Sequence, residues 1–420
     1  MQSVTKPTNG SGRAMPRGLQ RWAAAVILSG LVGGASPAGG QEPQAAPSPT
    51  AAGEATVASL FTDFLHYSVL GKFDIADTYA QEMLNHPKLD PVEVLRLSEA
   101  QAESVDTLLI LVNNSTIGER AARVLEVIRE GERTLRKQSD QIAINIEKLG
   151  GHPQTEYLAT MHLVESGEYA VPLMIQTLGD ESKKALWNRV IRALPQMGKS
   201  ALNPLVESLA VRDDNLRETV IGVLGEIGYG QAVPYLLAVA SDEATTSSVR
   251  EAAMSAVERI GQRLGRRFGE SPSAAFVELG EQFYDEHGSV AADVRDPDAN
   301  VWYWNAENQF AENTAVPSRI FGQVMAMRCA ERALQLDGDA ADAIGLWLAA
   351  NIRRESRLGV NVESGDPAET GETDPTRPAE LPRALYFTSA AGPRYAHMVL
   401  NRAIADRDPP VALGALAALQ

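Results

Sequence analysis

Hydrophobic residues recur at helical spacing along most of the chain, with prolines, glycines and acidic residues at the ends of the predicted helices. Between 169 and 264 one pattern occurs three times. Each copy begins with a proline-led apolar run, passes an acidic turn, continues as a second apolar helix and ends at Gly198, Gly228 or Gly261. These glycines recur about every 30 residues, a period typical of helix pairs stacked into an α-solenoid.

The flanking segments carry the same helical spacing without the regular period. We expect a helical hairpin at 54–89, a helical connector or short coiled-coil arm at 90–168, a helical region at 271–358 and a partial repeat at 394–420. The segment 359–382 is rich in proline, glycine and acidic residues and lacks periodicity, which predicts a disordered acidic loop. The predicted fold class is therefore all-α.

The three copies resemble HEAT repeats of the type found in phycobilisome lyases. When the closing glycines are aligned, Trp187 occupies the position of Arg217 and Arg250. The resemblance implies that these arginines, together with an aspartate in each acidic turn, form a structural ladder between neighbouring repeats rather than a site. The aspartates are Asp180, Asp213 and Asp242.

Two other segments resemble tetratricopeptide repeats. In 54–89, a bulky first helix is followed by a turn at Gly71 and a second helix built around Ala76. We expect these two small residues to let the helices approach closely. Within 271–358, alanines at helical spacing from Ala326 to Ala333 reproduce the second helix of such a repeat. The mixed order is similar to that of exported bacterial repeat proteins.

The first residues have the outline of a secretory signal peptide. Arg17 and Arg21 precede an apolar run of about 14 residues, shorter than the roughly 20 that a membrane span needs, and small residues follow it. We expect a signal peptide at 1–38, a flexible linker at 39–53, and a periplasmic or extracellular location. An uncleaved N-terminal anchor is the alternative.

The composition and charge of the chain limit the kinds of partner that it can bind. The 420 residues are 44% hydrophobic and 22% charged, as in ordinary globular proteins, and their formal charge of −16 opposes binding to nucleic acid. Cys329 is the sole cysteine, so no intramolecular disulfide can form, and its apolar neighbours predict a buried side chain. The last apolar helix ends at Gln420 without a closing glycine, so we expect either a truncated repeat or pairing through this end.

Motifs of catalysis, phosphate binding and cofactor binding are absent from the sequence, and none of its six histidines is followed by glutamate. We therefore predict no catalytic residue and no cofactor. One spacing fits a calcium loop, although Val301 stands where that loop needs glycine. The competing interpretation is an Asp-Pro turn that leads into a helix and buries two tryptophans. The calcium-ligand candidates are Asp296, Asp298, Asn300 and Glu307.

The aromatic cluster Trp302, Tyr303 and Trp304 is either part of a core or an exposed binding surface, since aromatic residues dominate interface hot spots. The predicted function is a non-enzymatic exported scaffold that binds a protein or peptide through the concave surface of the solenoid. The alternative is an enzyme or enzyme accessory of the HEAT-repeat lyase type, which would attach a chromophore.

Overall fold

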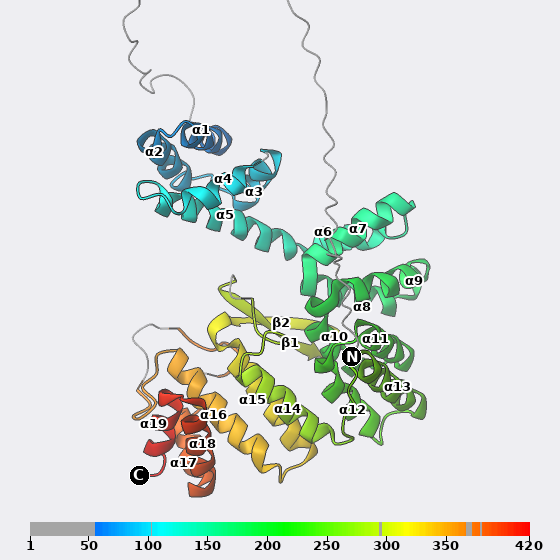
Figure 1. Ribbon diagram of the computed structural model, residues 1–420. Coiled ribbons are helices and arrows are strands. Elements are labelled where there is room, and N and C mark those ends of the chain that lie inside the picture. The colour runs from blue at the N-terminus through cyan, green and yellow to red at the C-terminus, as the bar shows by residue number, and fades with distance from the viewer. Residues whose placement is uncertain (1–54, 102, 294–295, 367–371, 379) are drawn as a thin grey trace, which may run out of the picture. The chain divides into compact units, whose positions relative to one another are not determined.

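The computed structural model describes residues 55–101, 103–293, 296–366, 372–378 and 380–420. This part of the chain is mostly helical, as predicted, and contains one two-stranded antiparallel sheet (Figure 1). The predicted signal peptide at 1–38 and linker at 39–53 lie outside the described residues. None of the described helices is long and apolar enough to cross a membrane.

The N-terminal helices share one hydrophobic core, and α5 packs against α3 and α4 rather than projecting as an arm. They are α1 (Val57–Val69), α2 (Phe73–Leu84), α3 (Pro91–Ala100), α4 (Ser104–Leu111) and α5 (Gly118–Arg136). Ala76 is fully buried between α1 and α2, as expected. Gly71 makes the predicted turn, with a φ of +70°, but it does not let the helices approach closely, since no atom lies within 4 Å of the position its Cβ would take.

The central helices share a second core. They are α6 (Ser139–Lys148), α7 (Pro153–Ser166), α8 (Ala170–Gly179), α9 (Lys184–Ala193), α10 (Leu202–Glu207), α11 (Asp214–Ile227), α12 (Val233–Ser241) and α13 (Ser247–Leu264). Short 3-10 turns join several of them: η1 (Gly167–Tyr169), η2 (Glu181–Lys183), η3 (Leu194–Ala201), η4 (Ser208–Ala210) and η5 (Gly230–Ala232).

Of the three predicted closing glycines, Gly228 ends α11 as expected, and Gly198 interrupts the helical backbone inside η3. Gly198 and Gly228 have φ values of +58° and +76°, which glycine adopts without strain. Gly261 closes no helix, because α13 continues for another turn and ends at Gly265, with a φ of +64°. The third closing residue was therefore misplaced by four positions.

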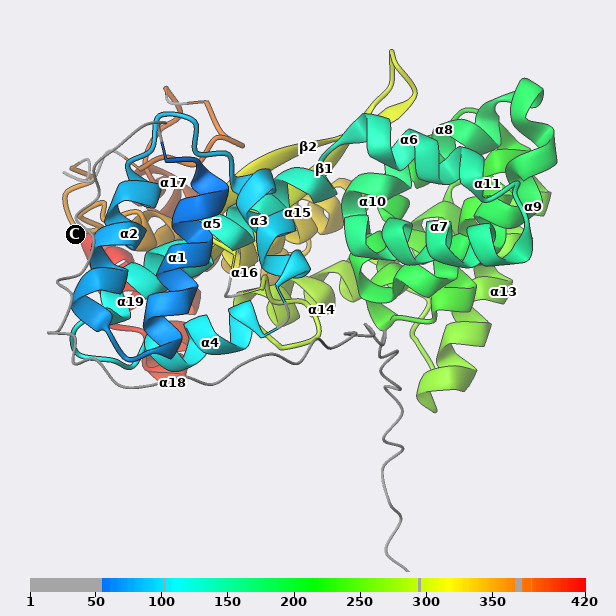
Figure 2. The ribbon, with the colours of Figure 1, turned by 90° about the horizontal axis from the view of Figure 1, so that it is seen from above.

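The C-terminal elements surround a third core. They are α14 (Pro272–Tyr284), β1 (Asp298–Asn305), β2 (Phe310–Pro317), α15 (Ser318–Leu336), α16 (Ala341–Arg357), α17 (Ala384–Ala391), α18 (Pro393–Asp406) and α19 (Pro409–Ala417). α14 packs on both α12 and α15, so the central and C-terminal helices are in contact. The hairpin of β1 and β2 lies against α10 and α15 (Figures 1 and 2).

The hairpin corrects the expectation of a helix after Pro297. Aromatic and β-branched residues from Val301 to Trp304 favour an extended strand, and β2 pairs with β1 in the register Trp302 opposite Asn313. The turn between them is closed by Asn305, whose Oδ1 accepts the amide hydrogens of Glu307 and Asn308.

One part of the segment 359–382, which is predicted to be a disordered loop, makes a buried contact in the structure. Residues 372–378 are placed against α16 by Asp374, which is 6% exposed and hydrogen-bonded to Arg354. Composition alone predicted disorder, because the composition of a segment does not reveal an anchoring interaction with a helix outside it.

Candidate binding site

A polar cluster fixes the hairpin to the turn η1. Glu168 accepts hydrogen bonds from Trp302 Nε1 at 2.7 Å and from Asn300 Nδ2 at 2.6 Å. Asn300 Nδ2 also donates to the Tyr169 hydroxyl at 2.6 Å, and Asn313 Nδ2 donates to Asn300 Oδ1 at 2.8 Å. Because side chains two apart on a strand lie on one face, Asn300 and Trp302 reach the same carboxylate.

Burial controls the ionisation of this cluster. It raises the pKa of Glu168, and the hydrogen bonds from Trp302 and Asn300 to its carboxylate partly oppose that rise. Burial likewise raises the pKa of the Tyr169 phenol. The cluster therefore holds one carboxyl group whose proton is bound more tightly than in water.

A second set of interactions holds the other edge of the hairpin. Arg328 of α15 donates to the Trp302 carbonyl oxygen at 2.7 Å and to Glu207 Oε1 at 3.0 Å. Its guanidinium also lies 4.3 Å from the centroid of the Tyr303 ring. Glu207, on α10, is only 7% exposed, so the ion pair is largely removed from solvent. β1 is thus clamped between α10 and α15.

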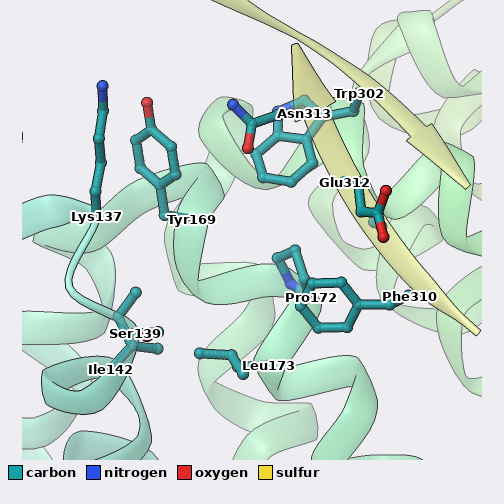
Figure 3. Close-up of a pocket in the computed structure, with 11 residues that line it drawn as sticks. Lys137, Ser139, Ile142, Tyr169, Pro172, Leu173, Trp302, Phe310, Glu312 and Asn313 are labelled. Carbon is teal, nitrogen blue, oxygen red and sulfur yellow. The ribbon is translucent and has the colours of Figure 1, made fainter. Parts of the chain in front are cut away.

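A pocket of about 440 Å³ opens between the hairpin and the helices α6 and α8, and we call it the hairpin pocket (Figure 3). Its floor is apolar and its rim carries hydrogen-bonding groups. In Figure 3, Lys137 and Tyr169 face Glu312 and Asn313 across the opening. The lining residues are Lys137, Ser139, Ile142, Tyr169, Pro172, Leu173, Trp302, Phe310, Ala311, Glu312 and Asn313.

A larger hollow of about 730 Å³ adjoins the hairpin pocket, since Lys137 and Tyr169 line both. Arg133 and Arg136 contribute to one side of it, and Ala315 of β2 to another. Together the two hollows follow β2 from Phe310 to Ala315.

The predicted calcium loop is wrong. Its first residues form an extended strand rather than a loop curled around an ion, and β1 alone spans about 24 Å at roughly 3.4 Å per residue. Glu307 lies in the hairpin turn beyond the end of β1, far from Asp296 and Asp298, and Asn300 is engaged with Glu168. Among the described residues, no three His, Cys, Asp or Glu side chains are grouped to hold a metal ion.

The aromatic cluster is divided between two roles. Trp302 is 3% exposed, so its ring is part of the interior and not an exposed anchor. Tyr303 and Trp304 are half-buried, against Arg328 and the central core respectively. A binding role for these two stays a prediction.

The predicted ladder residues act mainly within their own repeats. Asp180, Asp213 and Asp242 accept amide hydrogens from Ser182, Leu216 and Ala244, so each caps its own turn. The idea that these aspartates connect neighbouring repeats is therefore wrong, although their structural role is confirmed.

Arg217 and Trp187, at the predicted arginine position, also bond within their own repeats and not between neighbouring ones. Arg217 donates through Nε and Nη2 to the Val211 carbonyl oxygen, at 3.1 and 2.6 Å. Trp187, which replaces arginine, donates through Nε1 to the carbonyl oxygens of Thr177 and Asp180, at 3.0 and 3.2 Å. Arg250 is half-buried, and among the described residues its side chain forms no hydrogen bond or ion pair.

Cys329 is buried, as predicted, and burial raises the pKa of its thiol to about 12. A thiol of this kind stays protonated at neutral pH and is a poor nucleophile. Glu207, Arg328, Glu168 and Asn313 were not identified from the sequence. The first two could have been found, because each interrupts a mostly apolar run of residues.

No protein-family model matches the chain, and a comparison with curated proteins finds no match.

Proposed function

We propose that this chain is a non-enzymatic scaffold that binds a polypeptide segment of a protein partner at the hairpin pocket. The observation that carries the proposal is the wall made by four consecutive residues of β2, from Phe310 to Asn313. Consecutive side chains on a strand point to opposite faces, so a pocket lined by all four borders the edge of the strand. Strand edges recognise polypeptide backbone.

The helical framework supports this proposal. α11 packs on α13, α12 on α13 and α14, and α14 on α15, so each helix pair contacts the next. We infer an α-solenoid of HEAT-like and tetratricopeptide-like pairs, exported to the periplasm or the cell exterior. Such frameworks hold a binding surface in a fixed geometry. We therefore propose that the partner binds at the hairpin and not at the concave surface that was expected from the sequence.

The lining of the hairpin pocket indicates the kind of residue that it accepts. Pro172, Leu173 and Phe310 provide apolar contacts, while Ser139 and Asn313 at the rim can hydrogen-bond the backbone of the bound segment. A volume of about 440 Å³ is enough for a large apolar side chain of the bound segment.

A peptide display library selected on the purified chain tests the proposal. We expect enriched sequences with an apolar anchor residue, whose affinity is then measured by fluorescence polarisation. Leu173→Glu places a charge on the pocket floor and should weaken binding by about tenfold or more. Leu173 is half-buried and packs against the edge of the central core, so the circular dichroism spectrum of the variant must first match that of the unaltered chain.

The matched control is Leu416→Glu on α19, an exposed leucine remote from the hairpin pocket in sequence, which should leave the affinity unchanged. Failure to enrich any peptide, or equal binding by the two variants, would refute the proposed function.

A further inference from the structure

The backbone hydrogen-bonding pattern identifies which groups of β2 point away from β1. The Ser318 amide donates to the Pro297 carbonyl oxygen at 2.8 Å, which makes this a hydrogen-bonded pair at the base of the hairpin. Bonded and non-bonded pairs alternate in an antiparallel sheet. Trp302 and Asn313 therefore form a non-bonded pair, and the N–H and C=O groups of Asn313 and Ala315 point outward from β2.

The partner strand supports the same assignment independently. The Trp302 carbonyl oxygen accepts a hydrogen bond from Arg328 of α15, so it points away from β2. The outer edge of β1 is thus occupied by α15 at this position. The outer edge of β2 is the accessible one.

Nothing in the described part of the chain pairs with this edge. Asn313 and Ala315 are exposed, and within the described ranges no protein group hydrogen-bonds their backbone N–H or C=O. An unpaired strand edge is a template for a further strand. The hairpin pocket and the adjoining hollow border this edge from Phe310 to Ala315, so an added strand would have space beside it.

The charges beside the edge select among peptides. Arg136 and Lys137 are exposed and line the hollow, and neither forms an ion pair with a carboxylate of the described residues. The Lys137 ammonium lies 5.6 Å from the centroid of the Tyr169 ring. Asp296, from the segment before β1, is paired with Arg133 at 3.9 Å. Arg136 and Lys137 are thus two cations without a carboxylate partner, in a hollow whose lining also includes Glu165, Glu168, Asp293, Asp296 and Asp298.

We propose that an extended acidic peptide segment of another protein adds to the outer edge of β2 as a third strand. Its backbone pairs with Asn313 and Ala315, an apolar side chain enters the hairpin pocket, and a carboxylate contacts Arg136 and Lys137. This inference rests on the proposed function and specifies how the bound segment is held.

Backbone N-methylation of a selected peptide tests strand addition on the unaltered protein. N-methylation at every second residue of the peptide should weaken its binding about tenfold, because each methylated amide loses a hydrogen bond to β2. N-methylation at the residues between them should change the affinity by less than about threefold. Hydrogen exchange should slow at the amides of Asn313 and Ala315 on binding. Glu312 and Thr314 already donate within the hairpin, so their amides should change little.

Two variants distinguish the contribution of the Asn313 backbone amide to peptide binding from that of its side chain. Asn313→Pro removes the outward amide hydrogen, and Asn313→Ala keeps it while losing the same side-chain bond to Asn300. We expect the proline variant to bind about tenfold more weakly than the alanine variant. Replacing the acidic residues of the peptide with lysine should weaken binding to the unaltered protein.

Several results would overturn the inference while leaving the proposed function intact. The first is peptide binding that depends on Leu173 but is weakened equally by N-methylation at every position. The second is equal affinity of the Asn313→Pro and Asn313→Ala variants for the peptide. The third is tighter binding of the lysine-substituted peptide. A dimer of the unaltered chain that Asn313→Pro converts to a monomer would place a second copy on the edge instead. Loss of peptide enrichment altogether would refute the proposed function itself.

Discussion

Arg354 and Asp374 form a buried ion pair that attaches the segment 372–378 to α16. Arg354 Nη1 and Asp374 Oδ2 are 2.9 Å apart, and the two side chains are 8% and 2% exposed. Arg354 also donates through Nη2 to Asn351 Oδ1 at 2.9 Å, and the Asp374 Oδ1 accepts the amide hydrogen of Thr376. Both charged groups are thus paired and hydrogen-bonded, as buried ions require.

Replacing Asp374 with alanine should strongly destabilise the fold. Arg354 would keep Asn351 and Glu355 as partners but lose its nearer counter-charge, and breaking a buried ion pair costs about 3 kcal/mol in free energy of unfolding. Urea unfolding monitored by circular dichroism measures the loss.

The control for this experiment is Glu363→Ala, an exposed acidic residue of the same connecting segment. It should change the free energy of unfolding by less than about 0.5 kcal/mol. If Asp374→Ala is equally mild, the ion pair does not hold the segment.

Helices were predictable from the sequence where their signals are local. Asp90 caps α3 by accepting the Val92 amide hydrogen, and Ser271 caps α14 in the same way, each followed by proline. The order of the helices followed from such caps and from apolar spacing. The ends of the helices were less predictable: within the predicted connector at 90–168, α3 and α4 are separated at Glu103, whose φ is +74°.

The candidate site depended on contacts between distant residues, which the pattern along the chain does not reveal. Trp302 and Asn300 were noticed for their chemistry, but their partner Glu168 lies 134 positions from Trp302. The short strands were also missed, because helical periodicity on both sides favoured continuing the helical interpretation. The aromatic and β-branched content of Val301–Trp304 was the available signal.

Glu168→Gln should change how stability depends on pH. Because burial raises the pKa of Glu168 above its ordinary value of 4.5, the folded chain binds this proton more tightly than the unfolded chain does. Stability from this group is therefore present at low pH and falls as pH rises from 4.5 through the higher folded pKa. The variant lacks this titration, so its stability relative to the unaltered chain should increase across that window.

Urea unfolding at a series of pH values measures the difference between the two proteins. Glu243→Gln, at an exposed glutamate in the turn after α12, should reproduce the pH profile of the unaltered chain. Parallel profiles for Glu168→Gln and the unaltered chain would contradict the assignment.

Trp187 should be replaceable by arginine at lower cost than by phenylalanine. Phenylalanine removes the Nε1 donor from the carbonyl oxygens of Thr177 and Asp180, and one such hydrogen bond contributes about 1 kcal/mol. Arginine restores a donor at the position where Arg217 bonds the Val211 carbonyl oxygen. Thermal unfolding should rank the unaltered chain first, Trp187→Arg second and Trp187→Phe last. The reverse order of the two variants would show that aromatic packing, and not the donor, determines this position.

Three glycines of the repeats should respond to alanine in different directions. At Gly222, inside α11, an added Cβ meets no atom within 4 Å, so Gly222→Ala should raise the free energy of unfolding by about 0.5–1 kcal/mol. At Gly261 the Cβ would lie 2.7 Å from the Arg266 carbonyl oxygen, and the backbone must shift, at a cost of about 1–3 kcal/mol.

Gly265 distinguishes this steric effect from backbone strain. Its Cβ position is open, but its φ of +64° disfavours alanine, so Gly265→Ala should cost about 1 kcal/mol without a clash. If the third repeat instead ended at Gly261, as the sequence period suggests, Gly265→Ala would be neutral. Chemical denaturation of the three variants under one set of conditions therefore tests where α13 ends.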